Sequence, residues 1–221
     1  GGISIKPSQG MEEMKLDMSG GAAVVEAMGL IAQQGVPLDV VGIVPATENM
    51  PSGTATKPGD VVTAMNGKTI EVINTDAEGR LILADALALA DEETPDLLVS
   101  MATLTGAARV ALGPELPALF TQNDRFAEAM QRIGQSEKDP TWRLPLWRPY
   151  EEMLASKFAD LNNVSQSSFA GAVTAALFLS RFVAQAKIYA HLDMFCWNAS
   201  AKPGRPEGGE VMGARAPFAY L

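Results

Sequence analysis

A cluster of charged residues directly before a long apolar run constrains the fold of this chain most. Residues 81–90 are almost wholly apolar and rich in good helix formers, which predicts a buried helix. Residues 74–80 precede this run and contain two carboxylates, Asp76 and Glu78, and one cation, Arg80. The N-terminal end of a helix favours negative charge, because it carries unsatisfied N–H groups and the positive end of the helix dipole. A helix cap needs only one acid, whereas two acids and an arginine could also form a site for a metal and an anion. On this segment alone the two interpretations are about equally supported.

Short apolar runs alternate with helical patterns along the rest of the chain. Residues 60–65 and 68–73 predict a hairpin around the turn Asn66-Gly67, which leads directly into residues 74–80. Further buried strands are predicted at residues 38–45, 97–102, 118–121 and 188–194. Further helices are predicted at residues 125–135 and 172–184, and another helical pattern runs through residues 23–31 and is ended by Gly35-Val36-Pro37. This alternation predicts an α/β fold: one three-layer αβα domain over residues 1–221, with a central mixed, largely parallel sheet.

Composition narrows the classes of function. A chain of 221 residues is long enough to bury a large core, and no apolar run is long and charge-free enough to predict a membrane span. The net charge of −9 argues against nucleic acid as the default partner, because a phosphate-binding surface is basic. Cys196 is the only cysteine, so no internal disulfide can form, which agrees with a cytoplasmic location.

The scarcity of histidine and cysteine also limits the kind of metal site. With one of each, the chain cannot build a zinc-finger-type or histidine-rich site. Any metal must be held largely by oxygen ligands, which leaves Mn²⁺, Mg²⁺ or Zn²⁺ open. The single histidine, His191, lies in an apolar strand pattern, which is typical of a core residue, and we assign it no catalytic role.

Residues 74–81, Asn-Thr-Asp-Ala-Glu-Gly-Arg-Leu, resemble the signature octapeptide of the leucyl aminopeptidase family, also called cytosol aminopeptidases. Residues 1–7, 14–23, 102–107 and 159–163 resemble further segments of that family. The likeness weakens at residues 194–197, where Met-Phe-Cys-Trp replace the small residues expected there. The resemblance implies the family's C-terminal catalytic domain, truncated at its N-terminal side.

The resemblance assigns roles to residues position by position. It implies that Asp17, Asp76 and Glu78 are metal ligands. It implies that Lys6 stabilises the tetrahedral oxyanion and that Arg80 holds an anion such as bicarbonate, which shuttles a proton. Substrate-pocket roles are implied for Met14, Thr103, Thr105 and Gly106.

Several of these residues also have a simpler interpretation. Asp17 could cap the helix that follows it, Lys6 could be a solvated surface charge, and threonines in a turn usually make local hydrogen bonds.

The resemblance implies a two-metal aminopeptidase that releases N-terminal, preferably apolar, amino acids from peptides by attack of metal-activated water. Two Mn²⁺ or Zn²⁺ ions, or Mg²⁺, would serve it, and the implied assembly is a cytoplasmic homohexamer. The family also has a segment before the Gly-Gly of residues 1–2 that supplies two metal ligands, and a smaller N-terminal domain. Neither is in this chain, so we expect an incomplete domain that is inactive alone and holds at most one weakly bound cation.

Two other classes of function remain open. One is a different divalent-metal hydrolase, such as a phosphate-ester hydrolase, since residues 76–80 alone would allow it. The other is a non-catalytic DNA-binding or structural role, against which the acidic composition and the lack of a basic stripe argue.

Overall fold

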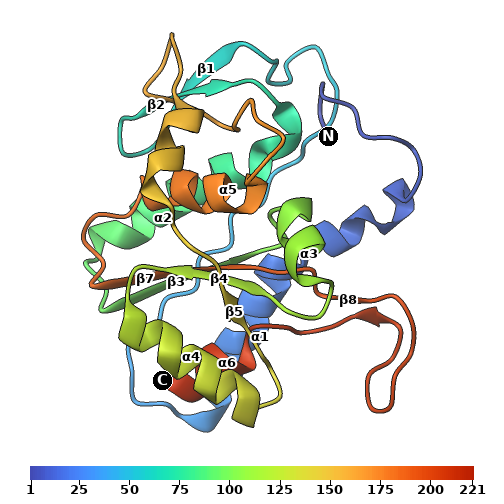
Figure 1. Cartoon of the computed structure of the whole chain (residues 1–221), viewed down its shortest axis with the longest axis vertical. Coiled ribbons are helices and arrows are strands. Elements are labelled where there is room, and N and C mark those ends of the chain that lie inside the picture. Colours follow the sequence, from blue (N-terminus) through green and yellow to red (C-terminus); the bar gives the residue numbers. More distant parts are fainter. The chain divides into compact units, whose positions relative to one another are not determined.

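A computed structural model describes residues 1–221 and mixes helices with small sheets, which confirms the α/β class (Figure 1). Contacts within the chain divide it into two compact units. Unit 1 comprises Gly1–Glu12, Pro45–Leu98 and Leu146–Lys187, and unit 2 comprises Glu13–Val44, Val99–Pro145 and Ile188–Leu221. None of the helices is both long and apolar enough to cross a membrane.

Unit 1 is built on a three-stranded sheet in the order β1-β2-β6. Strand β1 (Asp60–Thr63) pairs antiparallel with β2 (Thr69–Val72), and β2 pairs parallel with β6 (Leu161–Asn162). The predicted hairpin is therefore confirmed, and its Gly67 adopts the positive φ of 84° that an Asn-Gly turn requires. The helical elements of unit 1 are η2 (Thr75–Ala77), α2 (Glu78–Glu92), η3 (Arg148–Leu154) and α5 (Gly171–Ser180).

Helix α2 begins earlier than the apolar run predicts. It starts at Glu78, so Glu78 and Arg80 lie in its first turn rather than in a loop before it. Glutamate and arginine are good helix formers, and a glutamate in the first turn interacts favourably with the helix dipole. The N-cap residue is Ala77, which makes no side-chain cap, so neither acid of the motif occupies the capping position.

Helix α5 ends at Ser180, four residues before the predicted end at 184. The backbone N–H groups of Ala184, Gln185 and Ala186 all donate to the carboxylate of Asp91, at 2.7–3.0 Å. Backbone N–H groups held by a side chain in this way cannot donate to helical carbonyl groups. Because Asp91 binds the N–H groups of residues 184–186, these residues do not continue helix α5.

Unit 2 contains a four-stranded mixed sheet in the order β3-β7-β4-β5. Strand β4 (Ala118–Thr121) pairs antiparallel with β7 (Ile188–Asp193) and parallel with β5 (Trp142–Arg143). Strand β3 (Leu97–Ala102) completes the sheet, with its residues from Val99 onward in unit 2. The sequence predicted no strand after residue 194, but the antiparallel pair β8 (Trp197–Asn198) and β9 (Gly208–Gly209) follows β7.

The helical elements of unit 2 include the 3₁₀ helix that carries Asp17. These elements are η1 (Met11–Met18, which begins in unit 1), α1 (Ser19–Gln34), α3 (Gly106–Leu112), α4 (Asp124–Ser136) and α6 (Arg215–Tyr220). Helix α1 ends at Gly35 in the left-handed conformation, as predicted. A Cβ at Gly20 would lie 2.5 Å from the carbonyl oxygen of Met101, so only glycine lets α1 pack this closely on β3.

The core of unit 2 surrounds strand β4, whose four residues are all buried. Phe120 of β4 stacks on His191 of β7, with ring centroids 6.1 Å apart. His191 is 1% exposed, and its Nδ1 lies 2.9 Å from the Ser100 hydroxyl. The interpretation of His191 as a core residue is therefore confirmed.

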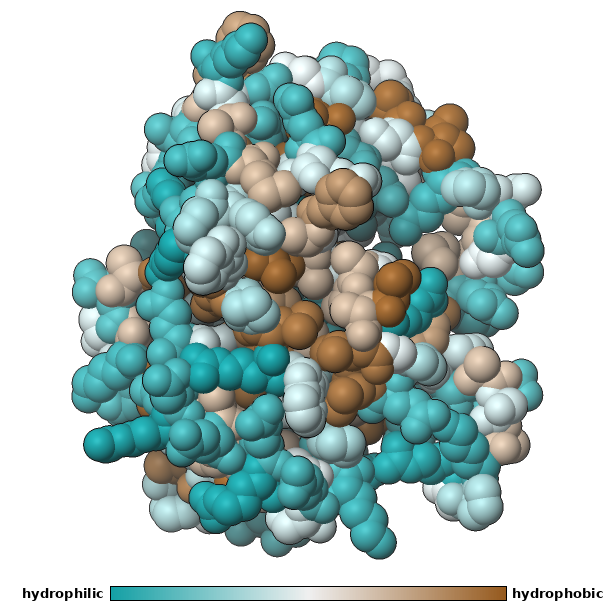
Figure 2. Space-filling model, in the orientation of Figure 1, coloured by the Kyte–Doolittle hydropathy of each residue, from teal (hydrophilic) through white to brown (hydrophobic).

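The prediction of a buried strand at residues 38–45 is wrong. These residues belong to none of the three sheets, and Leu38, Val41 and Val44 are 49%, 78% and 44% exposed. A β-branched run favours extended structure, but a strand forms only where a neighbouring strand supplies its hydrogen bonds. Figure 2 shows that apolar side chains are also exposed among hydrophilic ones on the face that it draws.

Candidate functional site

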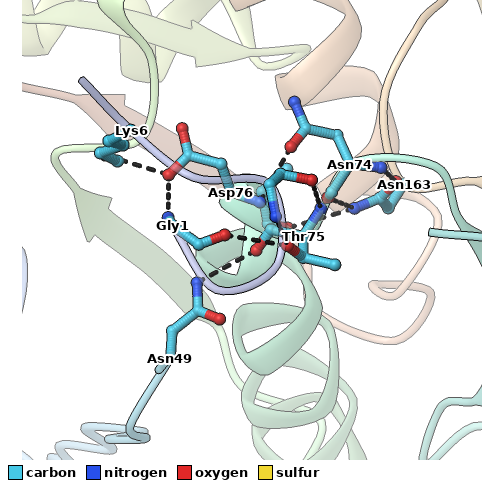
Figure 3. Close-up of polar contacts among 9 residues, drawn as sticks. Gly1, Lys6, Asn49, Asn74, Thr75, Asp76 and Asn163 are labelled. Carbon is cyan, nitrogen blue, oxygen red and sulfur yellow. Dashed lines mark hydrogen bonds and ion pairs between the residues drawn. The ribbon is translucent and has the colours of Figure 1, made fainter. Parts of the chain in front are cut away.

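The predicted residues Lys6 and Asp76 contact each other in unit 1. Lys6 Nζ lies 3.1 Å from Asp76 Oδ1, and the backbone nitrogen of Gly1 contacts the same oxygen (Figure 3). The side chains of Lys6 and Asp76 are 30% and 33% exposed. One oxygen of the Asp76 carboxylate therefore pairs with the Lys6 ammonium at a partly solvated position.

Residues 1–4 are held against the motif by Thr75, which is buried. Thr75 Oγ1 donates to the carbonyl of Gly1 at 2.9 Å and accepts from the N–H of Ser4 at 2.8 Å. The Ser4 hydroxyl accepts in turn from the N–H of Thr75 at 3.0 Å. These three bonds fix the segment that carries Lys6 beside Asp76.

Asparagine side chains hold the motif itself. Asn74 Oδ1 accepts from the N–H of Asp76 at 2.9 Å, and Asn49 Nδ2 donates to the carbonyl of Thr75 at 3.0 Å (Figure 3). A third asparagine, Asn163, bonds the backbone around Asn74. Sequence reasoning gave no role to Asn49 or Asn163, and the only signal for Asn163 was its place in the family-like segment 159–163.

Arg80 is buried at the N-terminal end of α2, with 8% of its surface exposed. Its Nη1 donates to the carbonyl of Asn163 at 2.9 Å. Glu78 lies two residues earlier in the same first turn, partly buried. The structure thus gathers four of the predicted residues at one helix N-terminus in unit 1.

The remaining predicted residues lie in unit 2, where Asp17 does not cap a helix. Its Oδ1 accepts from the Thr103 hydroxyl at 3.0 Å, and the N-cap position of α1 belongs to Met18. The capping interpretation of Asp17 is therefore wrong. Met14 lies one turn earlier on η1 and is partly buried.

Thr105 is the N-cap of α3, and Gly106 is the first residue of that helix. The Thr105 hydroxyl accepts from the N–H of Ala108 at 3.1 Å and donates to Asp193 Oδ2 at 2.6 Å. Asp193 Oδ1 also accepts from the N–H groups of Leu104 and Thr105, both at 3.1 Å. Thr105 therefore makes the local hydrogen bond expected of a threonine in a turn, whereas Thr103 bonds Asp17, 86 positions away. Asp193, to which sequence reasoning gave no role, anchors Leu104 and Thr105.

A family model for the catalytic domain of the cytosol aminopeptidase family matches residues 1–216. The chain belongs to the cytosol aminopeptidase family. This match confirms the resemblance of residues 74–81 to that family. The activity of the family is metal-dependent hydrolysis of peptides.

Several relatives and solved structures agree with this assignment. A probable cytosol aminopeptidase of Chlorobium limicola is 50% identical over 216 residues, which are 97% of this chain and 43% of that protein. The crystal structure of the cytosol aminopeptidase from Coxiella burnetii superposes with a TM-score of 0.96 at 50% identity, over 100% of this chain and 48% of that one. The bottromycin maturation enzyme BotP in complex with Mn superposes with a TM-score of 0.93 at 41% identity, over 99% of this chain and 49% of that one. The chain thus spans less than half the length of these cytosol aminopeptidase relatives.

The donor chemistry at the α2 N-terminus fits the divalent cation on which cytosol aminopeptidases depend. Asp76 and Glu78 offer carboxylate oxygens, the ligands that Mn²⁺ and Mg²⁺ prefer and that Zn²⁺ accepts. The Lys6 ammonium on Asp76 Oδ1 shows that this carboxylate pairs with a cation. Nowhere in residues 1–221 do three histidine, cysteine or acidic side chains form a group that could hold a metal. Asp76 of η2 and Glu78 of α2 are therefore only part of a set of metal ligands.

Cys196, a residue of unit 2, is not among the candidate metal ligands. It is 2% exposed, and burial raises the pKa of its thiol to about 11. Because the thiolate is the reactive form, we expect Cys196 to react with a disulfide reagent at pH 7.5 far more slowly than free cysteine and at the ordinary rate in urea. A colorimetric thiol assay with and without denaturant measures both rates, and full reaction of the native chain within minutes would contradict the burial.

Proposed function

We propose that this chain carries catalytic residues of a two-metal aminopeptidase that releases N-terminal, preferably apolar, amino acids from peptides. The observation that carries the proposal is the contact between Lys6 and Asp76 beside the first turn of α2, which holds Glu78 and Arg80. A cation, two carboxylates and a buried arginine at one helix N-terminus are the groups that metal-assisted hydrolysis needs.

We assign the metal-ligand role to Asp76 and Glu78 in unit 1 and to Asp17 in unit 2. Mn²⁺, Zn²⁺ and Mg²⁺ all suit carboxylate ligands, and the Mn in the BotP complex favours Mn²⁺ as the first ion to test. When bound, a pair of such ions polarises a peptide carbonyl and lowers the pKa of a coordinated water.

Lys6 is assigned to the oxyanion that develops on the scissile carbonyl. Its ammonium is held by Asp76 rather than extended into solvent, since the side chain is only 30% exposed. A pre-positioned cation stabilises developing negative charge without reorganising during the reaction.

Arg80 is assigned to an anion, bicarbonate, that moves the proton of the attacking water. The only histidine, His191, is buried in the core of unit 2 beside Ser100 and Phe120. Since this imidazole is committed to the core, a bound anion takes the part of the general base. The guanidinium is rigid and always charged, so it suits a planar oxyanion.

The substrate pocket is assigned to four residues of unit 2: Met14, Thr103, Thr105 and Gly106. We further propose peptides as substrates, a homohexamer as the assembly and the cytoplasm as the location, for which the relatives named cytosol aminopeptidases are the support.

Replacing Arg80 by alanine should lower the rate without removing metal. In a full-length family member with the same motif, we expect kcat to fall about 100-fold, the lower end of what acid–base assistance contributes. Added bicarbonate should raise the rate of the parent and not that of the variant. Arg143→Ala, which removes an arginine that pairs with the exposed Asp124, is the control and should leave the rate unchanged. A parent indifferent to bicarbonate together with a fully active Arg80→Ala would exclude the proton shuttle.

The function itself is tested by offering the same full-length protein, with Mn²⁺, a leucine anilide and a phosphate monoester. We expect release of the aniline only. Hydrolysis of the phosphate ester instead would favour the phosphate-ester hydrolase, and a salt-dependent shift of duplex DNA in a gel would favour the nucleic-acid role.

A further inference from the structure

We propose that Asn163 is a positioning residue, which sets the backbone of residues 73–77 and the place of Arg80 and thereby aims Asp76 and Glu78. Its consequence for metal binding rests on the proposed function. Asn163 is fully buried, with 0% of its surface exposed, and its side chain contacts the motif through hydrogen bonds (Figure 3).

The amide of Asn163 uses both of its ends. Oδ1 accepts from the N–H of Ile73 at 2.9 Å and from the N–H of Asn74 at 3.4 Å. Nδ2 donates to the carbonyl of Asn74 at 2.7 Å and to the carbonyl of Ala77 at 3.5 Å. A primary amide has two donors and an acceptor with two lone pairs, so its hydrogen-bonding capacity is filled by the motif.

The backbone of Asn163 ties the same motif to the sheet and to Arg80. Its N–H donates to the carbonyl of Glu71 at 2.9 Å, which continues the β2–β6 pairing beyond Asn162. Its carbonyl accepts from Arg80 Nη1 at 2.9 Å. One residue therefore links the end of β2, the 3₁₀ turn that carries Asp76 and the first turn of α2.

No other side chain can make this set of bonds at the same size. Aspartate keeps the two acceptor contacts but faces the carbonyls of Asn74 and Ala77 with a second oxygen, which repels them. Alanine leaves the partly buried N–H groups of Ile73 and Asn74 and two carbonyl groups without their hydrogen bonds to the amide, and it opens a cavity. Both changes should release the motif rather than only lower stability.

The preceding residue supplies a matched control. Asn162 is the last residue of β6, directly before Asn163, and is 2% exposed, but its Nδ2 donates to the carbonyl of Ala155 at 2.6 Å and makes no bond to residues 73–80. It lines a cavity of about 490 Å³ with Glu71 and Ser156. Asn162→Ala therefore removes the similarly buried amide of the neighbouring residue without touching the motif.

The test compares Asn163→Ala, Asn163→Asp and Asn162→Ala in the full 221-residue chain. Hydrogen exchange should show faster exchange of the Ile73 and Asn74 amides in both Asn163 variants and unchanged exchange there in Asn162→Ala. Mn²⁺ affinity, read from the electron paramagnetic resonance of free Mn²⁺, should fall about 10–100-fold in the Asn163 variants, as for other residues that hold a metal ligand in place. Asn162→Ala should keep the affinity of the parent.

Equal affinities in the Asn162 and Asn163 variants, or unchanged exchange at Ile73 and Asn74, would overturn the positioning role. A parent chain that binds no Mn²⁺ would count against Asp76 and Glu78 as ligands, and the hydrogen-exchange comparison would then decide the inference by itself. Urea denaturation of all three variants separates local release from a general loss of stability.

Discussion

Asp76→Asn and Glu78→Gln should each remove Mn²⁺ binding at the α2 N-terminus while the chain stays folded. The loss should exceed the 10–100-fold typical of residues that only support a ligand, so we expect at least about 100-fold weaker binding. In a full-length family member, turnover of a leucine anilide should fall below detection. The fold should survive because Asp76 is one-third exposed, and its ion pair with Lys6 is worth about 1 kcal/mol or less.

The control for this pair is Asp96→Asn. Asp96 is also an acid of unit 1 that pairs with a lysine, Lys187, but its side chain is 86% exposed and remote from the motif in sequence. It should keep Mn²⁺ affinity and turnover. Near-normal turnover of either motif variant at saturating Mn²⁺ would show that the ligand assignment is wrong.

Asp91→Ala should be among the most destabilising single changes in unit 1, by about 3–4 kcal/mol. Its carboxylate is buried, with 6% exposed, and accepts from three successive backbone N–H groups, at residues 184–186. Hydrogen bonds to a charged acceptor contribute about 1.5–3 kcal/mol each, and N–H groups left unsatisfied add a further cost. Urea unfolding followed by circular dichroism measures the change.

Two further variants make the Asp91 result specific. Asp91→Asn keeps one acceptor oxygen and should lose about half as much stability. Asp96→Ala removes an exposed acid near the same end of α2 and should change the free energy of unfolding by less than about 0.5 kcal/mol. If Asp91→Ala and Asp96→Ala were equally mild, the backbone of residues 184–186 would not depend on the carboxylate.

Local patterns in the sequence predicted the elements whose cause is local. The hairpin of β1 and β2 follows from the Asn66-Gly67 turn, and α1 ends at Gly35 because glycine adopts the left-handed conformation readily. Helix α4 has the amphipathic period of its sequence and buries Phe126 and Met130. The family-like octapeptide of residues 74–81 was also sufficient to select Asp76, Glu78 and Arg80 as candidate site residues.

Tertiary structure alone decided which of these residues meet and which predicted elements form. Residues 38–45 have the composition of a buried strand, yet they pair with no sheet, because a ladder needs a second strand that local sequence does not encode. Lys6 reaches Asp76 because Thr75 holds residues 1–4 beside the motif through hydrogen bonds. Asn163 holds Ile73 from 90 positions away. The local sequence around an asparagine does not indicate such a role, because the role depends on which backbone groups the fold brings within hydrogen-bonding distance of the side chain.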